Sequence, residues 1–256
     1  MSSVAAPAAS AGSDPHPVHV LYAPKEGNAD DQYEDAYAIT KSANRVTIAV
    51  ADGASSAVFA REWAILLTQS FANDPTSAGL PEREDEVKRR IGELGKSWRE
   101  SVQDKATSWY AQEKLPQGSS AALLVVQWDL LHRTFRASSI GDVCLFVVRD
   151  NRLKYAFPLT KSTKFDDRPY LVTTEIASGA TKLPPVTRFG APYEPEDRFL
   201  ILTDAWAAYF LTEWEARRKP WNELPPGPTH LARWLKQRRD SGKLKNDDVT
   251  LVDLTL

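Results

Sequence analysis

A single cysteine, Cys144, is present among the 256 residues, which excludes a disulfide within the chain and is typical of a reducing compartment. Because Cys144 lies in the apolar stretch 143–148, we expect a buried small side chain there rather than a reactive thiol. The chain also has no run of roughly 20 apolar residues that could span a membrane, and no N-terminal pattern of a signal peptide. These absences favour a cytoplasmic protein without a membrane partner.

Charge of one sign is not in excess either. The 32 basic and 34 acidic residues leave a net charge of −2, which gives no reason to expect a nucleic acid partner. The length allows one large domain or two small ones. Residues 1–17, rich in alanine, serine and proline, are expected to form a disordered tail. We expect residues 18–256 to form a single domain.

The first half of the chain reads as strands followed by helices. Apolar runs and turn residues predict strands over 18–22, 34–39 and 46–53. The pair Ser55-Ser56 is positioned to cap a helix with an apolar stripe from Phe59 to Phe71. A second amphipathic helix begins near Pro81, and its apolar stripe is expected to run to Trp109. Two successive amphipathic helices would cover one face of a sheet.

The second half reads as strands, a long irregular segment, and then helices before a last strand. Runs at 121–128, 134–140 and 143–149, separated by turn residues, predict a meander of antiparallel strands. Residues 158–195 show no sustained period, and a loop this long is usually functional or mobile. The remaining pattern predicts a strand over 199–203, helices over 206–218 and 229–240 with Thr229 as cap, and a strand over 249–254.

Six acidic residues lie at strand ends or in turns between strands: Glu34, Asp35, Asp52, Asp142, Asp204 and Asp247. If they converge, they repel one another at neutral pH unless cations neutralise them. Oxygen ligands without histidine or cysteine favour hard ions such as Mg²⁺ or Mn²⁺ over Zn²⁺. The alternative is that each is an ordinary loop aspartate or glutamate, since loops that begin at strand ends are rich in such residues.

The order of the acidic motifs resembles a known family. The motifs are Glu34-Asp35-Ala36, Ala51-Asp52-Gly53, Gly118-Ser119-Ser120-Ala121, Ile140-Gly141-Asp142, Leu202-Thr203-Asp204 and Asp247-Asp248-Val249-Thr250. In this order they are similar to those of the metal-dependent type-2C Ser/Thr protein phosphatases, from about residue 20 to the C-terminus. The resemblance implies an α+β fold, a four-layer α-β-β-α sandwich of two antiparallel sheets flanked by helix pairs.

The resemblance also implies a reaction and its site. Asp52 matches the carboxylate that bridges two Mn²⁺ or Mg²⁺ ions, Gly53 offers a carbonyl ligand, and Asp204 and Asp247 match ligands of the second ion. Glu34 and Asp35 would hold metal-bound waters, and Asp142 matches the ligand of a third, weaker ion. The implied activity is hydrolysis of phosphoserine and phosphothreonine in proteins by a metal-activated water. The implied partners are a phosphorylated protein substrate and a Ser/Thr kinase or its target.

The sequence departs from the family pattern at several positions. Ala54 stands where many members carry a histidine proposed as general acid, Ala205 where glycine is usual, and Ala208 where a third-ion carboxylate is often found. Asp30 replaces the expected phosphate-binding arginine, and Lys25 is the candidate substitute. These departures leave open a pseudophosphatase that binds a phosphoprotein or kinase without turnover. A purely structural interaction domain with scattered acids would bind no metal.

Overall fold

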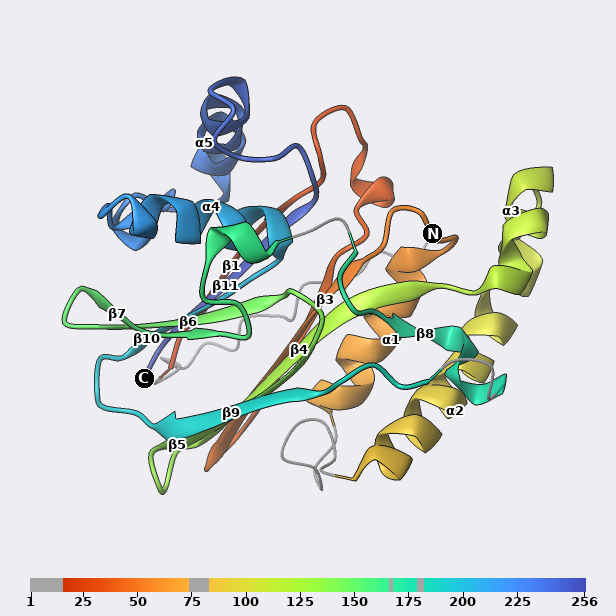
Figure 1. Cartoon of the computed structure of the whole chain (residues 1–256), viewed down its shortest axis with the longest axis horizontal. Helices are drawn as coiled ribbons and strands as arrows, with labels where there is room; N and C mark the ends of the chain where they lie inside the picture. Colours follow the sequence, from red (N-terminus) through yellow and green to blue (C-terminus); the bar gives the residue numbers. More distant parts are fainter. Residues whose placement is uncertain (1–15, 74–82, 166–167, 179–181) are drawn as a thin grey trace.

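The computed structural model describes residues 16–73, 83–165, 168–178 and 182–256, and two antiparallel sheets form its centre (Figure 1). The first sheet has the order β1-β11-β10-β6-β7, made of β1 (Val18–Ala23), β11 (Val249–Thr255), β10 (Arg198–Leu202), β6 (Cys144–Arg149) and β7 (Arg152–Phe157). The second has the order β2-β3-β4-β5-β9, made of β2 (Ala36–Ser42), β3 (Arg45–Gly53), β4 (Ser120–Asp129), β5 (Thr134–Ile140) and β9 (Thr187–Pro192), with β8 (Val172–Thr173) paired to β4.

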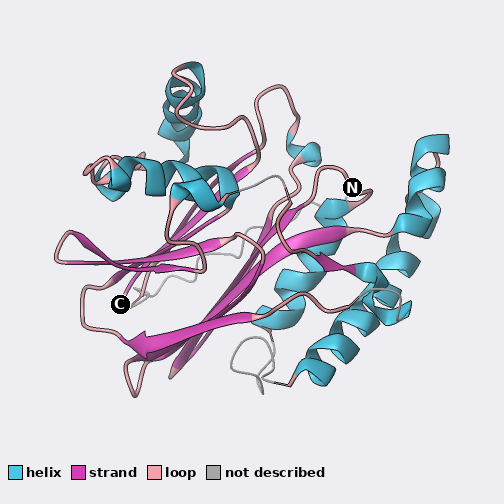
Figure 2. Cartoon of the chain, in the orientation of Figure 1, coloured by secondary structure: helices cyan, strands magenta, loops and turns pink. Residues whose placement is uncertain are grey.

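Helices lie on the outer faces of both sheets (Figure 2). The second sheet is covered by α1 (Ala60–Ala72) and α2 (Glu84–Val102), and the first by α4 (Asp204–Glu215) and α5 (Pro228–Asp240). The short helix α3 (Trp109–Lys114) extends beyond α2. The predicted α-β-β-α sandwich, with two antiparallel sheets and flanking helix pairs, is confirmed. None of the helices in the described ranges is long and apolar enough to cross a bilayer.

Strand β4 shows why the central strands carry unbroken apolar runs. Because successive side chains point to opposite faces, Leu124 and Val126 pack between the two sheets, whereas Leu123 and Val125 pack against α1 and α2. All four are fully buried. A strand with apolar cover on both faces gives no polar alternation. The runs predicted from sequence at 46–53, 121–128 and 199–203 correspond to such strands.

Three predicted helix features are wrong. The helix after Asp52-Gly53 begins at Ala60, and its N-cap is Phe59 in the left-handed region with φ of 53°, so Ser55 and Ser56 do not cap it. The apolar stripe of α2 ends at Val102, and Trp109 lies in the separate helix α3 with 75% of its surface exposed. At α5 the N-cap is Gly227 rather than Thr229.

The predicted meander is confirmed for its first hairpin, because β4 and β5 pair antiparallel, and is wrong at its second turn. The segment at Gly141 and Asp142 looks like a hairpin turn, but β5 ends in the second sheet and β6 begins in the first. The chain therefore crosses from one sheet to the other at this point. Gly141 has φ of 102°, and a Cβ there would lie 2.5 Å from the Cβ of Ala122, so the crossing requires glycine. This crossing places Asp142 at one end of the sandwich.

The long segment predicted as irregular contains more structure than expected. It includes β8, β9 and two short 3-10 helices, and β9 forms an edge of the second sheet. The side chains of β9 are mostly exposed, so this strand gives no apolar signal in the sequence. Most of the predicted tail over 1–17 lies outside the described residues, and the single-domain assignment of 18–256 stays a prediction.

Candidate metal centre

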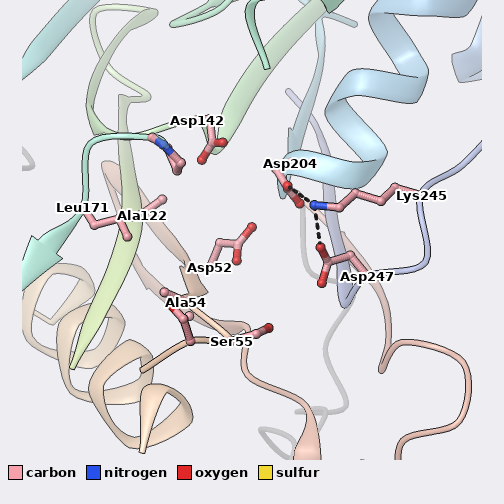
Figure 3. Close-up of a pocket in the computed structure, with 12 residues that line it drawn as sticks. Asp52, Ala54, Ser55, Ala122, Asp142, Leu171, Asp204, Lys245 and Asp247 are labelled. Atoms are coloured by element: carbon pink, nitrogen blue, oxygen red, sulfur yellow. Dashed lines mark ion pairs between the residues drawn. The ribbon is translucent and has the colours of Figure 1, made fainter. Parts of the chain in front are cut away.

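Four of the predicted carboxylates line one cavity of about 240 Å³ at the end of the sandwich (Figure 3). Asp52 comes from the end of β3, Asp142 from the crossing between the sheets, Asp204 from the start of α4, and Asp247 from the loop before β11. The full lining is Asp52, Gly53, Ala54, Ser55, Ser56, Ala122, Asp142, Pro169, Leu171, Asp204, Lys245 and Asp247. Segments far apart in the sequence thus bring four acidic groups together.

The end of β3 fixes Asp52 and Gly53. Strand β3 pairs with β2 and β4 on its two sides, and Asp52 is opposite Ala122 in the pairing with β4. A Cβ on Gly53 would lie 2.6 Å from the carbonyl oxygen of Glu34 and 3.1 Å from the Cβ of Ala60. The close backbone approach therefore requires glycine at position 53.

Burial and neighbouring negative charge raise the pKa of two cavity carboxylates, Asp52 and Asp204. Burial raises the pKa of Asp52 well above its usual value, and the charges of Asp35, Asp204, Asp142 and Asp247 add to it. Some of the Asp52 surface still reaches solvent, because its side chain opens onto the cavity. Burial also raises the pKa of Asp204, while the nearby Lys245 opposes this shift. The cavity therefore concentrates negative charge that a bound cation would neutralise.

Asp35 lies behind the cavity in a hydrogen-bonded site. Its Oδ2 accepts hydrogen bonds from Thr203 Oγ1 at 3.0 Å and Thr250 Oγ1 at 2.7 Å. Its Oδ1 is buried and accepts no hydrogen bond from any described residue. Burial raises the pKa of Asp35 well above its usual value. A buried carboxylate oxygen without a donor fits a site that is completed by water or a cation.

Glu34, the neighbouring predicted ligand, is partly buried at the entrance to β2 and does not line the cavity itself. Burial raises its pKa, and a hydrogen bond with Ser55 opposes the shift. Asp248 binds the backbone on both sides of this loop. Its Oδ2 accepts a hydrogen bond from the Glu34 backbone N–H at 2.6 Å, and its Oδ1 accepts one from the Lys25 backbone N–H at 2.8 Å. Asp248 thus positions the segment that carries Glu34 and Asp35.

The sequence motifs include Thr203, Asp248 and Thr250, but the sequence alone assigned no role to them. Their membership of the motifs was the available signal. The backbone N–H of Thr250 donates to Thr203 Oγ1 at 2.9 Å, which ties β11 to the end of β10. Both threonines are fully buried. They fix Asp35 rather than facing the cavity.

Lys245 is the lysine among the cavity residues, whereas Lys25 does not line the cavity. The Lys245 Nζ lies 3.0 Å from Asp247 Oδ2 and 3.7 Å from Asp204 Oδ2. Partial burial lowers the pKa of Lys245, but its contact with Asp247 and the charges of Asp204 and Asp52 outweigh this effect and raise it overall. The role of Lys25 as a phosphate ligand stays a prediction.

The donor set fits a hard divalent ion. Asp52, Asp142, Asp204 and Asp247 supply oxygen ligands, which Mg²⁺ and Mn²⁺ prefer. As they stand, no three His, Cys, Asp or Glu side chains of the described residues form a compact group that could hold an ion. Mutual repulsion opposes a closer approach of the carboxylates, and a bound cation would remove that repulsion.

The fold is shared with solved phosphatase structures. RsbX in complex with magnesium has 18% identity to this chain and a TM-score of 0.55, covering 94% of this chain and 95% of its own. The Ser/Thr phosphatase PstP/Ppp of Mycobacterium tuberculosis has 15% identity, a TM-score of 0.57, and coverage of 94% and 98%. Stp1 of Staphylococcus aureus has 12% identity, a TM-score of 0.59, and coverage of 93% and 94%. At these identities the likeness defines the fold class alone.

The family follows from the sequence itself. A model described as protein phosphatase 2C matches residues 28–237, which is most of the chain. The chain therefore belongs to the protein phosphatase 2C family, and the predicted resemblance is confirmed. No curated protein sequence matches the chain.

Proposed function

We propose that this protein is a Mn²⁺- or Mg²⁺-dependent phosphatase that hydrolyses phosphoserine and phosphothreonine in proteins. The observation that carries the proposal is the placement of Asp52, Asp142, Asp204 and Asp247 around one cavity. Its volume of about 240 Å³ is below the roughly 300–1,000 Å³ of sites for drug-sized ligands. A small, open, polar cavity suits a phosphoryl group presented by a larger molecule.

The family resemblance assigns these residues to ions, and four of the carboxylates line the cavity. Asp52 and the carbonyl of Gly53 would hold one ion, Asp52 would bridge to a second, and Asp204 and Asp247 would complete the second. Asp142 would hold a third ion, and Glu34 and Asp35 would hold water around the first two. When bound, divalent ions lower the pKa of water and neutralise charge on the phosphoryl group.

The side chains of the protein would orient the bound water and supply a proton to the leaving group. Asp35 is held by two buried threonine hydroxyls, which fix the orientation of its carboxylate and leave Oδ1 without a donor among the described residues. Ala54 lines the cavity and offers no proton donor. The hydroxyls of Ser55 and Ser56 and the ammonium of Lys245 are the side-chain proton donors that line it. Protonation of the leaving group would come from these groups or from water.

A second candidate function is a pseudophosphatase that binds a phosphorylated protein or a kinase without turnover. The observations that favour it are Ala54 in the cavity wall, where many family members carry a histidine, and Asp30 in place of the phosphate-binding arginine. In either case the partner is a phosphorylated protein, a Ser/Thr kinase or its target.

Phosphate release separates the two functions. We expect purified protein with excess Mn²⁺ to release phosphate from an aryl phosphate and from a phosphothreonine peptide. Asp204→Ala and Asp247→Ala should abolish release, whereas Asp129→Ala, which changes an exposed turn carboxylate bonded to His132, should not. A protein that binds Mn²⁺ by calorimetry but releases no phosphate would support the pseudophosphatase. Full activity in the Asp204 and Asp247 variants would contradict the site assignment.

A further inference from the structure

Lys245 places a cation between two of the carboxylates proposed to hold an ion. Figure 3 shows its side chain reaching across to both, with ion pairs to Asp204 and Asp247. The Nζ distances are 3.0 Å to Asp247 Oδ2 and 3.7 Å to Asp204 Oδ2. These oxygens belong to the same two side chains that a second divalent ion would use. The ammonium and the ion therefore require the same negative charge.

The loop that carries Lys245 is held on both sides. Leu244 is buried against α4 and α5, and its N–H donates to the carbonyl of Arg238 at 3.2 Å. On the other side, the Asp247 carbonyl accepts from Arg239 Nη2 at 2.6 Å, and the Asp247 N–H donates to the Lys245 carbonyl at 3.1 Å. The backbone at Lys245 is thus fixed close to the acidic groups.

The Lys245 side chain itself retains freedom to leave. It is 61% exposed, so its ammonium can turn to solvent without being buried elsewhere. A flexible four-carbon stem with a strongly hydrated charge is suited to such a movement. Two arrangements follow from this geometry. In one, the ammonium lies between Asp204 and Asp247, and in the other it lies in water.

We propose that Lys245 is a tethered competitor for the divalent ion at Asp204 and Asp247, so that this ion binds only when the ammonium moves away. The inference rests on the proposed metal-dependent function. The ion held mainly by Asp52 and Gly53 faces no such competitor, because Lys245 forms its ion pairs with Asp204 and Asp247. The two ions should therefore differ in affinity, and the second should bind only at higher free Mn²⁺.

The change in affinity for the second ion depends on the fraction of time that the ammonium of Lys245 is away from Asp204 and Asp247. If the ammonium leaves it open about a tenth of the time, the apparent Kd of the second ion rises about tenfold. Removing the ammonium removes that factor. A lysine that instead binds the phosphoryl group would leave Mn²⁺ affinity unchanged and raise KM when removed. The two roles thus predict different measurements.

The test is calorimetric titration of Mn²⁺ into the chelator-treated full-length protein and two variants of one loop. Lys245→Met removes the ammonium and keeps the length of the stem. Lys243→Met removes the same charge from the same loop, where Lys243 pairs with Glu213 at 3.7 Å instead of with the cavity. We expect Lys245→Met to bind the weaker Mn²⁺ about tenfold more tightly, with Lys243→Met equal to wild type. Lys245→Gln serves as a second neutral variant, and Lys245→Arg should keep the weak binding.

Each other outcome contradicts the inference in its own way. Unchanged Mn²⁺ binding in Lys245→Met and Lys245→Gln overturns the competition while the proposed function stands. Equal tightening in Lys245→Met and Lys243→Met would show a general charge effect. Unchanged binding with a raised KM for a phosphothreonine peptide would make Lys245 a phosphate ligand instead. Failure of wild type and all variants to bind Mn²⁺ would overturn both this inference and the proposed metal site.

Discussion

The two ends of strand β10 each carry an aspartate, and the two are used in opposite ways. Asp197 precedes the strand, is fully buried, and accepts hydrogen bonds from Arg149 Nε and Nη2, both at 2.7 Å. Asp204 follows the strand and shares its cavity with three other carboxylates and Lys245. One charge is neutralised by an arginine inside the fold. The other faces a cavity, where an exposed lysine and further carboxylates are its neighbours.

The difference separates charge that stabilises the fold from charge that can bind an ion. A buried carboxylate with a bidentate arginine needs no further partner. Carboxylates that face one another raise each other's pKa and oppose the fold until a cation arrives. The five residues of β10 and Thr203 separate the two aspartates, which corresponds to roughly 23 Å along an extended chain. The two ends can therefore be tested independently.

The largest effect is expected from Asp52→Asn at the acidic end. It should reduce Mn²⁺-dependent hydrolysis of an aryl phosphate by more than the roughly 10–100-fold typical of residues that only support a metal ligand. The free energy of unfolding in chelator should be unchanged or higher, because a repelled charge is removed. Urea unfolding and phosphate release measure the two effects. A variant that is both inactive and less stable would contradict this role for Asp52.

At the opposite end, Asp197→Asn should act on stability alone. It leaves Arg149 without its bidentate partner, and breaking a buried ion pair costs about 3–5 kcal/mol. The loss should be toward the lower value, since Arg149 keeps an ion pair with Glu194. Mn²⁺ affinity and kcat of the folded variant should match wild type. Lost Mn²⁺ binding with unchanged stability would reverse the proposed division between the two ends.

A smaller effect is expected from Gly53→Ala, which tests the backbone at the acidic end. The added Cβ would lie 2.6 Å from the Glu34 carbonyl oxygen, so the strand end must shift at a cost of about 1–3 kcal/mol. The shift should also weaken Mn²⁺ binding. Gly227→Ala is the matched control, because a Cβ there meets no described atom within 4 Å. Equal behaviour of the two variants would contradict the packing argument.

The smallest effect concerns pH and compares Asp52 with Glu213. A hydrogen bond from Arg218 lowers the pKa of Glu213, so its stabilisation is present above the unfolded value of about 4.3 and is lost as pH falls. The pKa of Asp52 is raised, so the pH dependence of its effect on stability is the opposite. Its contribution to the free energy of unfolding is present below the unfolded pKa of about 3.9 and is lost as pH rises.

In chelator at pH 7, Glu213→Gln should therefore lower the free energy of unfolding by about 1 kcal/mol, and Asp52→Asn should raise it. The Asp52→Asn difference should shrink as pH falls toward 4, and the Glu213→Gln difference should shrink as pH falls below about 4.3. Urea unfolding at several pH values measures them. Differences of the same sign at pH 7 would contradict the contrast between paired and clustered carboxylates.

Much of the fold could be predicted from the sequence because the central strands are buried on both faces. Their unbroken apolar runs mark β3, β4 and β10 and place Asp52 and Asp204 at strand ends. The predictions that were wrong concern features that a local sequence pattern does not determine. The turn at Gly141 and Asp142 looks the same in a hairpin and in a crossing between sheets, and the exposed strand β9 has no apolar pattern.

The candidate site was predictable to a similar extent. The ordered acidic motifs predicted six carboxylates at the site, and four of them line the cavity. The different roles of Asp247 and Asp248 depend on which residues surround them in three dimensions. Asp247 and Asp248 are adjacent and chemically alike, yet Asp248 binds two backbone N–H groups while Asp247 faces Lys245. Nothing in the local sequence separates these roles.

The most direct test of this account is a calorimetric titration of Mn²⁺ into chelator-treated wild type, Asp52→Asn and Asp197→Asn. The account predicts saturable binding by wild type and Asp197→Asn, and greatly weakened binding by Asp52→Asn. Absence of saturable Mn²⁺ binding by wild type, or equal binding by Asp52→Asn, would contradict a metal centre at this end of the sandwich.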